Sequence, residues 1–310
     1  MNITVHRRDF LASGLAAGLT LTAAGPIGAG KATSSPGQQG RFRLNYAPHF
    51  GMFRHHAGDE FIDQIRFMAD QGFTALEDSG MKRRPKPLQN RIRRELDRHG
   101  MRMGVFVATA DFGNSTFSSG RKPLRTKVLC DMKESVEVAK RLNAKWCIVV
   151  PGQIDHLRPI TEQTANVVET LRYCADICEP AGLVMLLEPL QHWVNHPQMF
   201  LHKIPQADRI CRAVGSPSCK MLFDIYHQKM TQNKLMATIN KACREIAYFQ
   251  IGDNPGRKEP GTGTIDYRSV LGSIHRTEFT GILGMEHGNS MPGKEGEQAV
   301  IDAYVAHDNF

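Results

Sequence analysis

Residues 184–286 contain four short apolar runs that each end in a side chain with an oxygen. The runs are VMLLE (184–188), KMLFD (220–224), IAYFQ (246–250) and GILGME (281–286). A continuous apolar run of this length is typical of a strand that is buried on both faces in a parallel sheet. A loop and then a helical pattern follow each run, and each interval is long enough for one connecting helix. This stretch therefore predicts four consecutive strand–helix units.

The same alternation extends upstream to residue 41. Four further strand-like runs are RFRLNYA (41–47), FTALE (73–77), MRMGVFVATA (101–110) and KWCIVVPG (145–152). Helices are expected over 59–71, 127–142 and 161–181, and Gly72, Gly100 and Gly182 fall where a left-handed helix cap is expected. Eight such units predict an α/β fold, a (β/α)8 TIM barrel, as one catalytic domain over residues 41–310. An open doubly wound sheet is the alternative, but no GxGxxG motif follows the first strand.

The composition is consistent with a single barrel domain but does not identify the ligand. The chain has 310 residues, of which 41% are hydrophobic, and this is enough for the core of one barrel. No apolar run reaches about 18 residues, so we expect no stable membrane insertion. The net charge of +8 fits an anionic small molecule, nucleic acid or a polyanionic matrix, and decides nothing alone. Seven cysteines without a CxxC pair predict free thiols.

The first thirty residues have the pattern of an export signal. Arg7, Arg8 and Phe10 precede a weakly apolar stretch that is rich in Ala and Gly. This pattern resembles a twin-arginine signal peptide, although His6 and Ala12 replace the usual Ser/Thr and Lys. We therefore expect a signal peptide over 1–30, a Ser/Gly/Gln-rich linker over 31–40, and a periplasmic or secreted protein. The alternative is an arginine pair before a short amphipathic segment.

The four strand-end side chains predict a metal site. In a closed barrel, Glu188, Asp224, Gln250 and Glu286 would meet at the carboxyl-terminal rim, where this architecture builds its active sites. Oxygen ligands suit Mg²⁺ or Mn²⁺. Glu188 and Glu286 lie on strands separated by two others, so they could flank a ligand and exchange a proton with it. Each residue alone has a plainer explanation as a helix cap or an ion-pair partner.

Other rim residues are candidate substrate contacts. His192 and His227 fall in the loops after two of the strands. The loop DNPGRKEPGTGTIDY (253–267) is rich in Gly and Pro, which predicts an ordered loop, and it presents Arg257 and Glu259. The planar guanidinium of Arg257 matches a substrate carboxylate. A surface turn with incidental charges, and a solvated or capping role for each histidine, are the alternatives.

The strings LLEPLQHW (186–193), LFDIYHQKM (222–230), FQIGDNPGRKEPGTGTIDY (249–267) and GILGMEH (281–287) closely resemble the hydroxypyruvate isomerase family, within the xylose-isomerase-like TIM barrels. The resemblance implies a divalent metal held by Glu188, Asp224, Gln250 and Glu286, with the two glutamates as the proton donor and acceptor. It also implies a keto–aldehyde isomerisation, from hydroxypyruvate to tartronate semialdehyde, through a metal-bound enediolate. The substrate would be a 2-keto acid or a sugar, and a homo-oligomer is left open.

The first half of the chain matches that family only in the order of its strands. The segments YAPHFGMFRHH (46–56) and VATADFGNSTFSSG (107–120) depart from it, so other functions stay open. A sugar or inositol epimerase, dehydratase or lyase would keep the same four ligands. An endonuclease-IV-like DNA repair enzyme would need several zinc ions held by histidines, so we expect no nucleic acid partner. The last alternative is a non-catalytic carbohydrate-binding protein.

Overall fold

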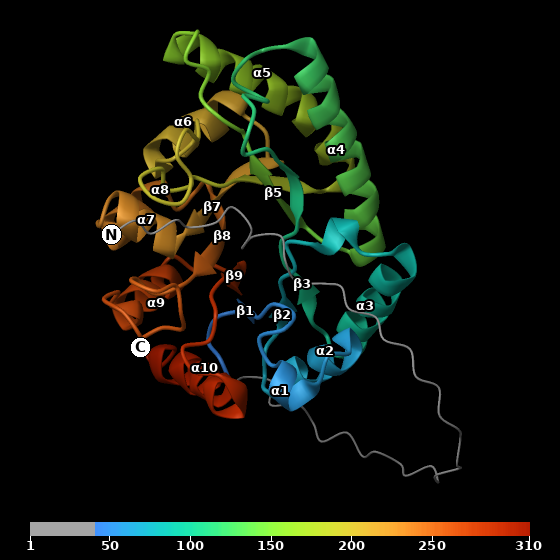
Figure 1. Cartoon of the computed structure of the whole chain (residues 1–310), viewed down its shortest axis with the longest axis vertical. Helices are drawn as coiled ribbons and strands as arrows, with labels where there is room; N and C mark the ends of the chain where they lie inside the picture. The colour runs from blue at the N-terminus through green and yellow to red at the C-terminus, as the bar shows by residue number, and fades with distance from the viewer. Residues whose placement is uncertain (1–40) are drawn as a thin grey trace, which may run out of the picture. The chain divides into compact units, whose positions relative to one another are not determined.

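Short parallel strands form the centre of the structure, and helices surround them (Figure 1). This computed structural model describes residues 41–310. The strands are β1 (Tyr46–Ala47), β2 (Ala75–Leu76), β3 (Arg102–Met103), β4 (Val107–Ala110), β5 (Trp146–Val150), β6 (Val184–Leu187), β7 (Cys219–Asp224), β8 (Ile246–Ile251) and β9 (Ile282–Met285). The helices are α1 (Arg54–Ala57), α2 (Phe61–Asp70), η1 (Met81–Arg83), α3 (Lys86–Arg98), α4 (Lys122–Leu142), α5 (Ile160–Cys178), η2 (Glu179–Ala181), α6 (Ile204–Val214), α7 (Ile225–Thr231), α8 (Leu235–Ala242), α9 (Tyr267–Arg276) and α10 (Gly293–His307).

Backbone hydrogen bonds close the strands into a barrel. Seven strands follow the order β1-β9-β8-β7-β6-β5-β4, and β2 pairs with β3, all in parallel. The Glu77 amide donates to the Pro48 carbonyl over 2.9 Å, and this bond links β2 to the end of β1. The predicted (β/α)8 barrel is therefore confirmed.

The third barrel strand differs from the sequence prediction because it is split. The run 101–110 forms β3, which pairs with β2, and then β4, which pairs with β5. Between them the Gly104 amide donates to the Leu76 carbonyl and the Ile148 amide donates to the Phe106 carbonyl. The chain thus stays bonded to both neighbours, but a register shift between Val107 and Thr109 interrupts regular pairing.

Alternation along the strands separates two apolar clusters. In β5, Trp146, Ile148 and Val150 belong to a small cluster with inward residues of the other strands, whereas Cys147 and Val149 belong to the large cluster packed with the helices. A strand places successive side chains on opposite faces, so these two clusters are the barrel interior and the helix–sheet layer. The same alternation continues past the end of each strand. A side chain there that follows the inward-facing positions therefore points into the barrel mouth.

The helix ends and cysteines follow the sequence prediction. Gly72, Gly100 and Gly182 all have positive φ, so the expected left-handed caps are confirmed. All seven cysteines are free thiols, and five of them are buried.

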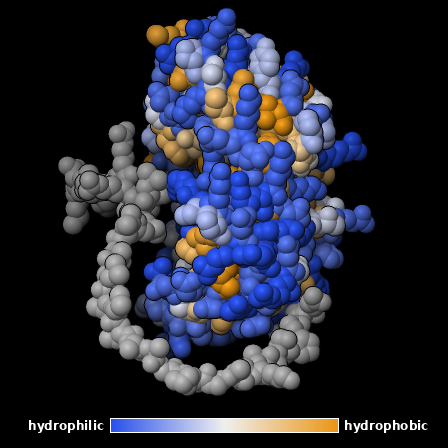
Figure 2. Space-filling model, turned by 90° about the vertical axis from the view of Figure 1, so that its right-hand side faces the viewer, coloured by the Kyte–Doolittle hydropathy of each residue, from blue (hydrophilic) through white to orange (hydrophobic). Residues whose placement is uncertain are grey.

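The sequence predicts export through a signal peptide and no stable membrane insertion. The signal peptide and linker lie outside the described residues, so export stays a prediction. Within residues 41–310, no helix is long and apolar enough to cross a membrane. The face seen in Figure 2 is mainly hydrophilic, with its hydrophobic residues in small separate groups.

Candidate metal and catalytic site

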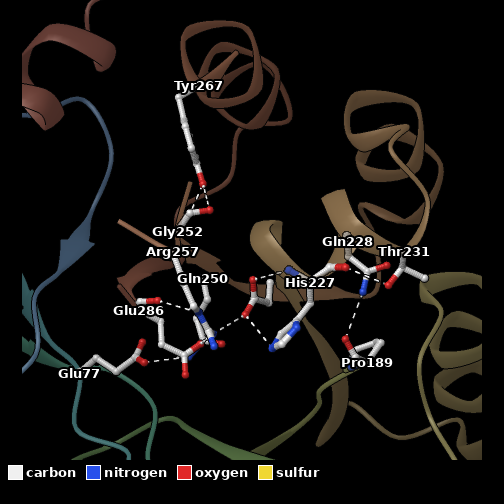
Figure 3. A network of polar contacts seen from close by, with 11 residues as sticks. Glu77, Pro189, His227, Gln228, Thr231, Gln250, Gly252, Arg257, Tyr267 and Glu286 are labelled. Carbon is white, nitrogen blue, oxygen red and sulfur yellow. Dashed lines mark hydrogen bonds and ion pairs between the residues drawn. The ribbon is translucent and has the colours of Figure 1, made fainter. Parts of the chain in front are cut away.

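The barrel brings the four strand-end side chains to one rim. Asp224 ends β7 and lies directly opposite Gln250 of β8 in the parallel register. Glu188 follows β6 and Glu286 follows β9. Glu188, Asp224 and Gln250 are buried, whereas 23% of the Glu286 side chain is exposed. Figure 3 shows Gln250 and Glu286 among the polar side chains that converge here.

Arg257 lies among these carboxylates. Its Nη2 donates to Asp224 Oδ2 over 2.9 Å and to Glu286 Oε2 over 2.6 Å, and its Nε donates to the Glu286 carbonyl over 3.1 Å. The guanidinium also lies 5.0 Å from the centre of the Tyr226 ring. The sequence predicts Arg257 as a substrate contact, and the structure shows in addition that it links two of the proposed metal ligands.

The loop that carries Arg257 is ordered by one buried carboxylate. Both oxygens of Asp253 accept hydrogen bonds from backbone amides, which belong to Asn254, Gly261, Gly263 and Ile265. The Arg257 amide itself donates to the Asp253 carbonyl over 2.8 Å. These bonds explain how a loop rich in Gly and Pro holds the guanidinium in a defined place.

Two histidines complete the polar side of the site. His227 is buried in the first turn of α7, where its amide donates to Asp224 Oδ1 over 3.0 Å, and its Nε2 lies 3.5 Å from Asp224 Oδ2. The His196 ring packs edge to face against the His227 ring, with 5.4 Å between centroids, and stacks on Phe112. Sequence reasoning missed His196, because no pattern in the loop after β6 distinguishes it.

The electrostatic surroundings suit proton transfer. Burial raises the pKa of Glu188 well above its usual range, and the charges of Glu286 and Asp224 raise it further. Partial burial raises the pKa of Glu286 to about 7, although Arg257 opposes this shift. Burial lowers the pKa of His227 to about 3, so this imidazole is neutral at physiological pH. The site therefore combines two carboxyl groups with raised pKa, of which Glu286 can release a proton near neutrality, with an uncharged hydrogen-bonding ring.

Glu77 is a buried carboxyl group at this site that sequence reasoning overlooked. It follows β2, and its side chain contacts Gln250 and Tyr248. Burial and then the charge of Glu286 raise its pKa to about 8. The same sequence pattern that identifies the four strand-end side chains also applies to Glu77, because FTALE (73–77) is an apolar run that ends in a carboxylate.

Two of the predicted substrate contacts, Glu259 and His192, have structural partners of their own. Glu259 is buried, and its oxygens accept hydrogen bonds from the amide and the hydroxyl of Ser290, so it joins the loop after β8 to the loop after β9. The His192 ring packs against Trp193 and His202, with centroids 4.2 and 4.1 Å away. These contacts give Glu259 and His192 structural partners and place neither against Asp224 or Glu286.

The donor atoms at the centre fit a hard divalent cation. Within the part of the chain that the structure describes, donor atoms of Glu188, Asp224 and His227 lie within 4.8 Å of one another. The buried Oε1 of Gln250 and the buried Nδ1 of His227 have no hydrogen-bond partner. A buried polar atom without a partner is costly, and an unpaired amide oxygen beside two carboxylates is a suitable ligand for Mg²⁺ or Mn²⁺.

A separate hollow of about 1040 Å³ lies at the opposite rim of the barrel. Arg102, Trp146 and Val184, which line it, are the first residues of β3, β5 and β6. The carboxylates follow the other ends of the strands, so this hollow does not belong to the candidate site.

The chain belongs to the xylose isomerase-like TIM barrel family, whose sequence pattern matches residues 65–304. Two sequence relatives are isomerases. Hydroxypyruvate isomerase from Escherichia coli (strain K12) is 34% identical over 123 residues, which cover 40% of this chain and 47% of that protein. 2-oxo-tetronate isomerase from Pectobacterium atrosepticum is 24% identical over 233 residues, which cover 73% of this chain and 86% of that protein.

These likenesses differ in what they support. The chain spans about half the length of the Escherichia coli relative, and most of the Pectobacterium relative. The two relatives support an isomerase. The crystal structure of AP endonuclease, family 2, from Brucella melitensis has a TM-score of 0.70 at 21% identity, and covers 82% of this chain and 96% of that chain. Identity this low shows a shared fold alone.

Proposed function

We propose that this protein is a metal-dependent isomerase that moves a proton between adjacent carbons of a small hydroxylated 2-keto acid, with hydroxypyruvate as the first substrate to test. The observation that carries the proposal is the meeting of Glu188 and Glu286, two carboxyl groups with raised pKa, around Asp224 and Gln250 at the barrel mouth. The two isomerase relatives support the same reaction class.

The reaction needs one proton removed and one returned. One glutamate takes a proton from C3 of hydroxypyruvate, and the electron pair forms the C2–C3 double bond of an enediol species. The C2 carbonyl oxygen takes up the negative charge that results. A carboxyl group then delivers a proton to C2, the C3 hydroxyl proton passes to the C2 oxygen, and the C3 oxygen becomes the aldehyde carbonyl of tartronate semialdehyde. A divalent cation held by Glu188, Asp224, Gln250 and Glu286 would stabilise the negative charge on the two neighbouring oxygens.

Arg257, His227 and His196 would bind the substrate. The Nη1 of Arg257 takes no part in the bonds to Asp224 and Glu286, so it is available to a substrate carboxylate. Burial lowers the pKa of His196 to about 4, so both rings are neutral and can donate or accept a hydrogen bond at a substrate hydroxyl group. A positively charged guanidinium beside neutral rings favours a substrate with one anionic end.

A sugar epimerase would use the same carboxyl groups, and a substrate panel in deuterium oxide separates the two functions. We expect the protein loaded with Mg²⁺ or Mn²⁺ to convert hydroxypyruvate and to introduce solvent deuterium at the reacting carbon, and a chelator to stop both events. 2-oxo-tetronate is the second acid to test, and a neutral ketose such as D-tagatose is the control. Turnover of the ketose with none of either acid would contradict the proposal.

A further inference from the structure

Glu77 reaches across the barrel mouth to the amide of Gln250. It follows β2, whereas Gln250 lies on β8, and the strands between them are β1 and β9. Glu77 Oε1 accepts a hydrogen bond from Gln250 Nε2 over 2.8 Å, and Glu77 Oε2 accepts one from the Tyr248 hydroxyl, also over 2.8 Å. Figure 3 shows the Glu77 side chain directed toward Gln250 and Glu286. Both oxygens of this buried carboxyl group are thus occupied by donors from one strand.

Two glycines, one on β9 and one between β3 and β4, make room for this contact. A Cβ atom at Gly284 of β9 would lie 1.7 Å from Glu77 Oε2, so any other residue there would displace the carboxyl group. Gly284 pairs in register with Gln250 on one side and with Ala47 of β1 on the other. A Cβ atom at Gly104 would lie 2.6 Å from the Tyr248 hydroxyl oxygen. Close approach of these polar groups therefore depends on glycine at two positions.

The contact decides which end of the Gln250 amide faces the rim. Only the Nε2 group can donate, so a carboxylate oxygen at Glu77 holds the nitrogen end of the amide. The oxygen end, Oε1, is then left buried without a hydrogen-bond partner. A divalent cation bound at the rim would favour the ionised form of Glu77, which can only accept hydrogen bonds. If the amide were reversed beside this carboxylate, two oxygens would face each other, and an NH₂ group, which cannot bind a cation, would take the place of Oε1.

We infer that Glu77 is a positioning residue that orients the amide of Gln250, so that its oxygen, and not its nitrogen, is presented to a divalent cation. This inference rests on the metal site of the proposed function, and it assigns a role to a residue outside the predicted ligand set. Mutation of a group that orients a metal ligand commonly lowers metal affinity by about 10- to 100-fold.

Exchanging the two side chains tests the inference. In Glu77→Gln, residue 77 keeps only one acceptor for two donors, so the amide at 250 can reverse. In the double variant Glu77→Gln/Gln250→Glu, the amide at 77 donates to the carboxylate at 250 and accepts from Tyr248. Both hydrogen bonds are therefore kept, and only the bond between residues 77 and 250 reverses its direction. Residues 77 and 250 together keep the same net charge. The carboxylate at position 250 presents an oxygen to the cation in either orientation.

Calorimetric titration of metal-free protein with Mn²⁺ gives the readout. We expect Glu77→Gln to weaken binding by about 10- to 100-fold, and the double variant to bind within about threefold of wild type. Tyr248→Phe is the matched control, because it removes the other hydrogen bond to Glu77 but leaves the partner of Gln250 in place. Its thermal stability is expected to fall while its Mn²⁺ affinity stays unchanged.

Three outcomes would overturn the inference. They are an unchanged affinity in Glu77→Gln, a double variant as weak as Glu77→Gln, and a loss in Tyr248→Phe equal to that in Glu77→Gln. The last would show that the network matters only for stability. If Glu77→Gln does not fold, the double variant and Tyr248→Phe still decide the question. A wild-type protein that binds no Mn²⁺ would instead contradict the proposed function.

Discussion

Glu188→Gln and Glu286→Gln are each expected to lower kcat for hydroxypyruvate by about 10²- to 10⁴-fold, the usual contribution of a general acid or base. Each amide keeps an oxygen that can bind a cation, but it cannot take up or release a proton near neutral pH. Both glutamates carry raised pKa values at the barrel mouth, and each substitution removes one of the two carboxyl groups to which the proton transfer is assigned. Steady-state kinetics with the metal at saturation measures the effect.

Solvent deuterium exchange then separates the two roles. The variant that lacks the first base is expected to exchange no substrate proton, whereas the variant that lacks the second acid still exchanges the proton at C3. Glu245→Gln is the control, because Glu245 pairs with Lys220 over 2.7 Å at the opposite end of the barrel and should leave kcat unchanged. Near-normal turnover in either site variant would refute its assignment.

Arg257→Met is expected to raise KM for hydroxypyruvate by roughly 10- to 100-fold, because hydrogen bonds to charged groups contribute about 1.5–3 kcal/mol. The substitution also leaves the carboxylates of Asp224 and Glu286 without the guanidinium that pairs with them. Removing one partner of such a buried network costs on the order of 3 kcal/mol, so the metal-free variant should unfold at a lower temperature than wild type. Added Mn²⁺ should restore most of this stability, since a bound cation neutralises the same two carboxylates.

Arg257→Lys is the matched comparison for this variant. Lysine keeps the positive charge but loses the planar fork, so its metal-free stability should stay closer to wild type while its KM still rises. Unchanged KM and unchanged unfolding temperature in Arg257→Met would contradict the role given to the guanidinium.

The barrel and the rim were predictable because both follow from local patterns. Apolar runs such as VMLLE identify strands, and a residue that continues the inward alternation past a strand end must lie at the mouth of the barrel. Asp224 and Gln250 share a register position for this reason. The left-handed caps at Gly72 and Gly182 were predictable because they depend only on the residues that join a helix to the next strand.

Features that depend on contacts across the barrel were not predictable. The pairing of Arg257 with Asp224 and Glu286 is set by the bonds of Asp253 inside a long loop, and no spacing in the sequence encodes them. The packing of His196 on His227 joins the loop after β6 to helix α7. The split between β3 and β4 arises where the strand exchanges one neighbour for the other. Glu77 had the right pattern, but its reach to Gln250 is visible only in the closed barrel.

The central claim is that acidic side chains at the carboxyl-terminal rim bind one divalent cation, against the rival view that Arg257 already neutralises them as a purely structural network. Calorimetric titration of metal-free wild-type protein and Asp224→Asn with Mn²⁺ tests it most directly, because asparagine keeps the oxygen that accepts the His227 amide but loses the charge. We predict one ion per chain in wild type, and binding at least about tenfold weaker in the variant. Absence of binding in correctly folded wild-type protein, or equal binding in both proteins, would contradict the claim.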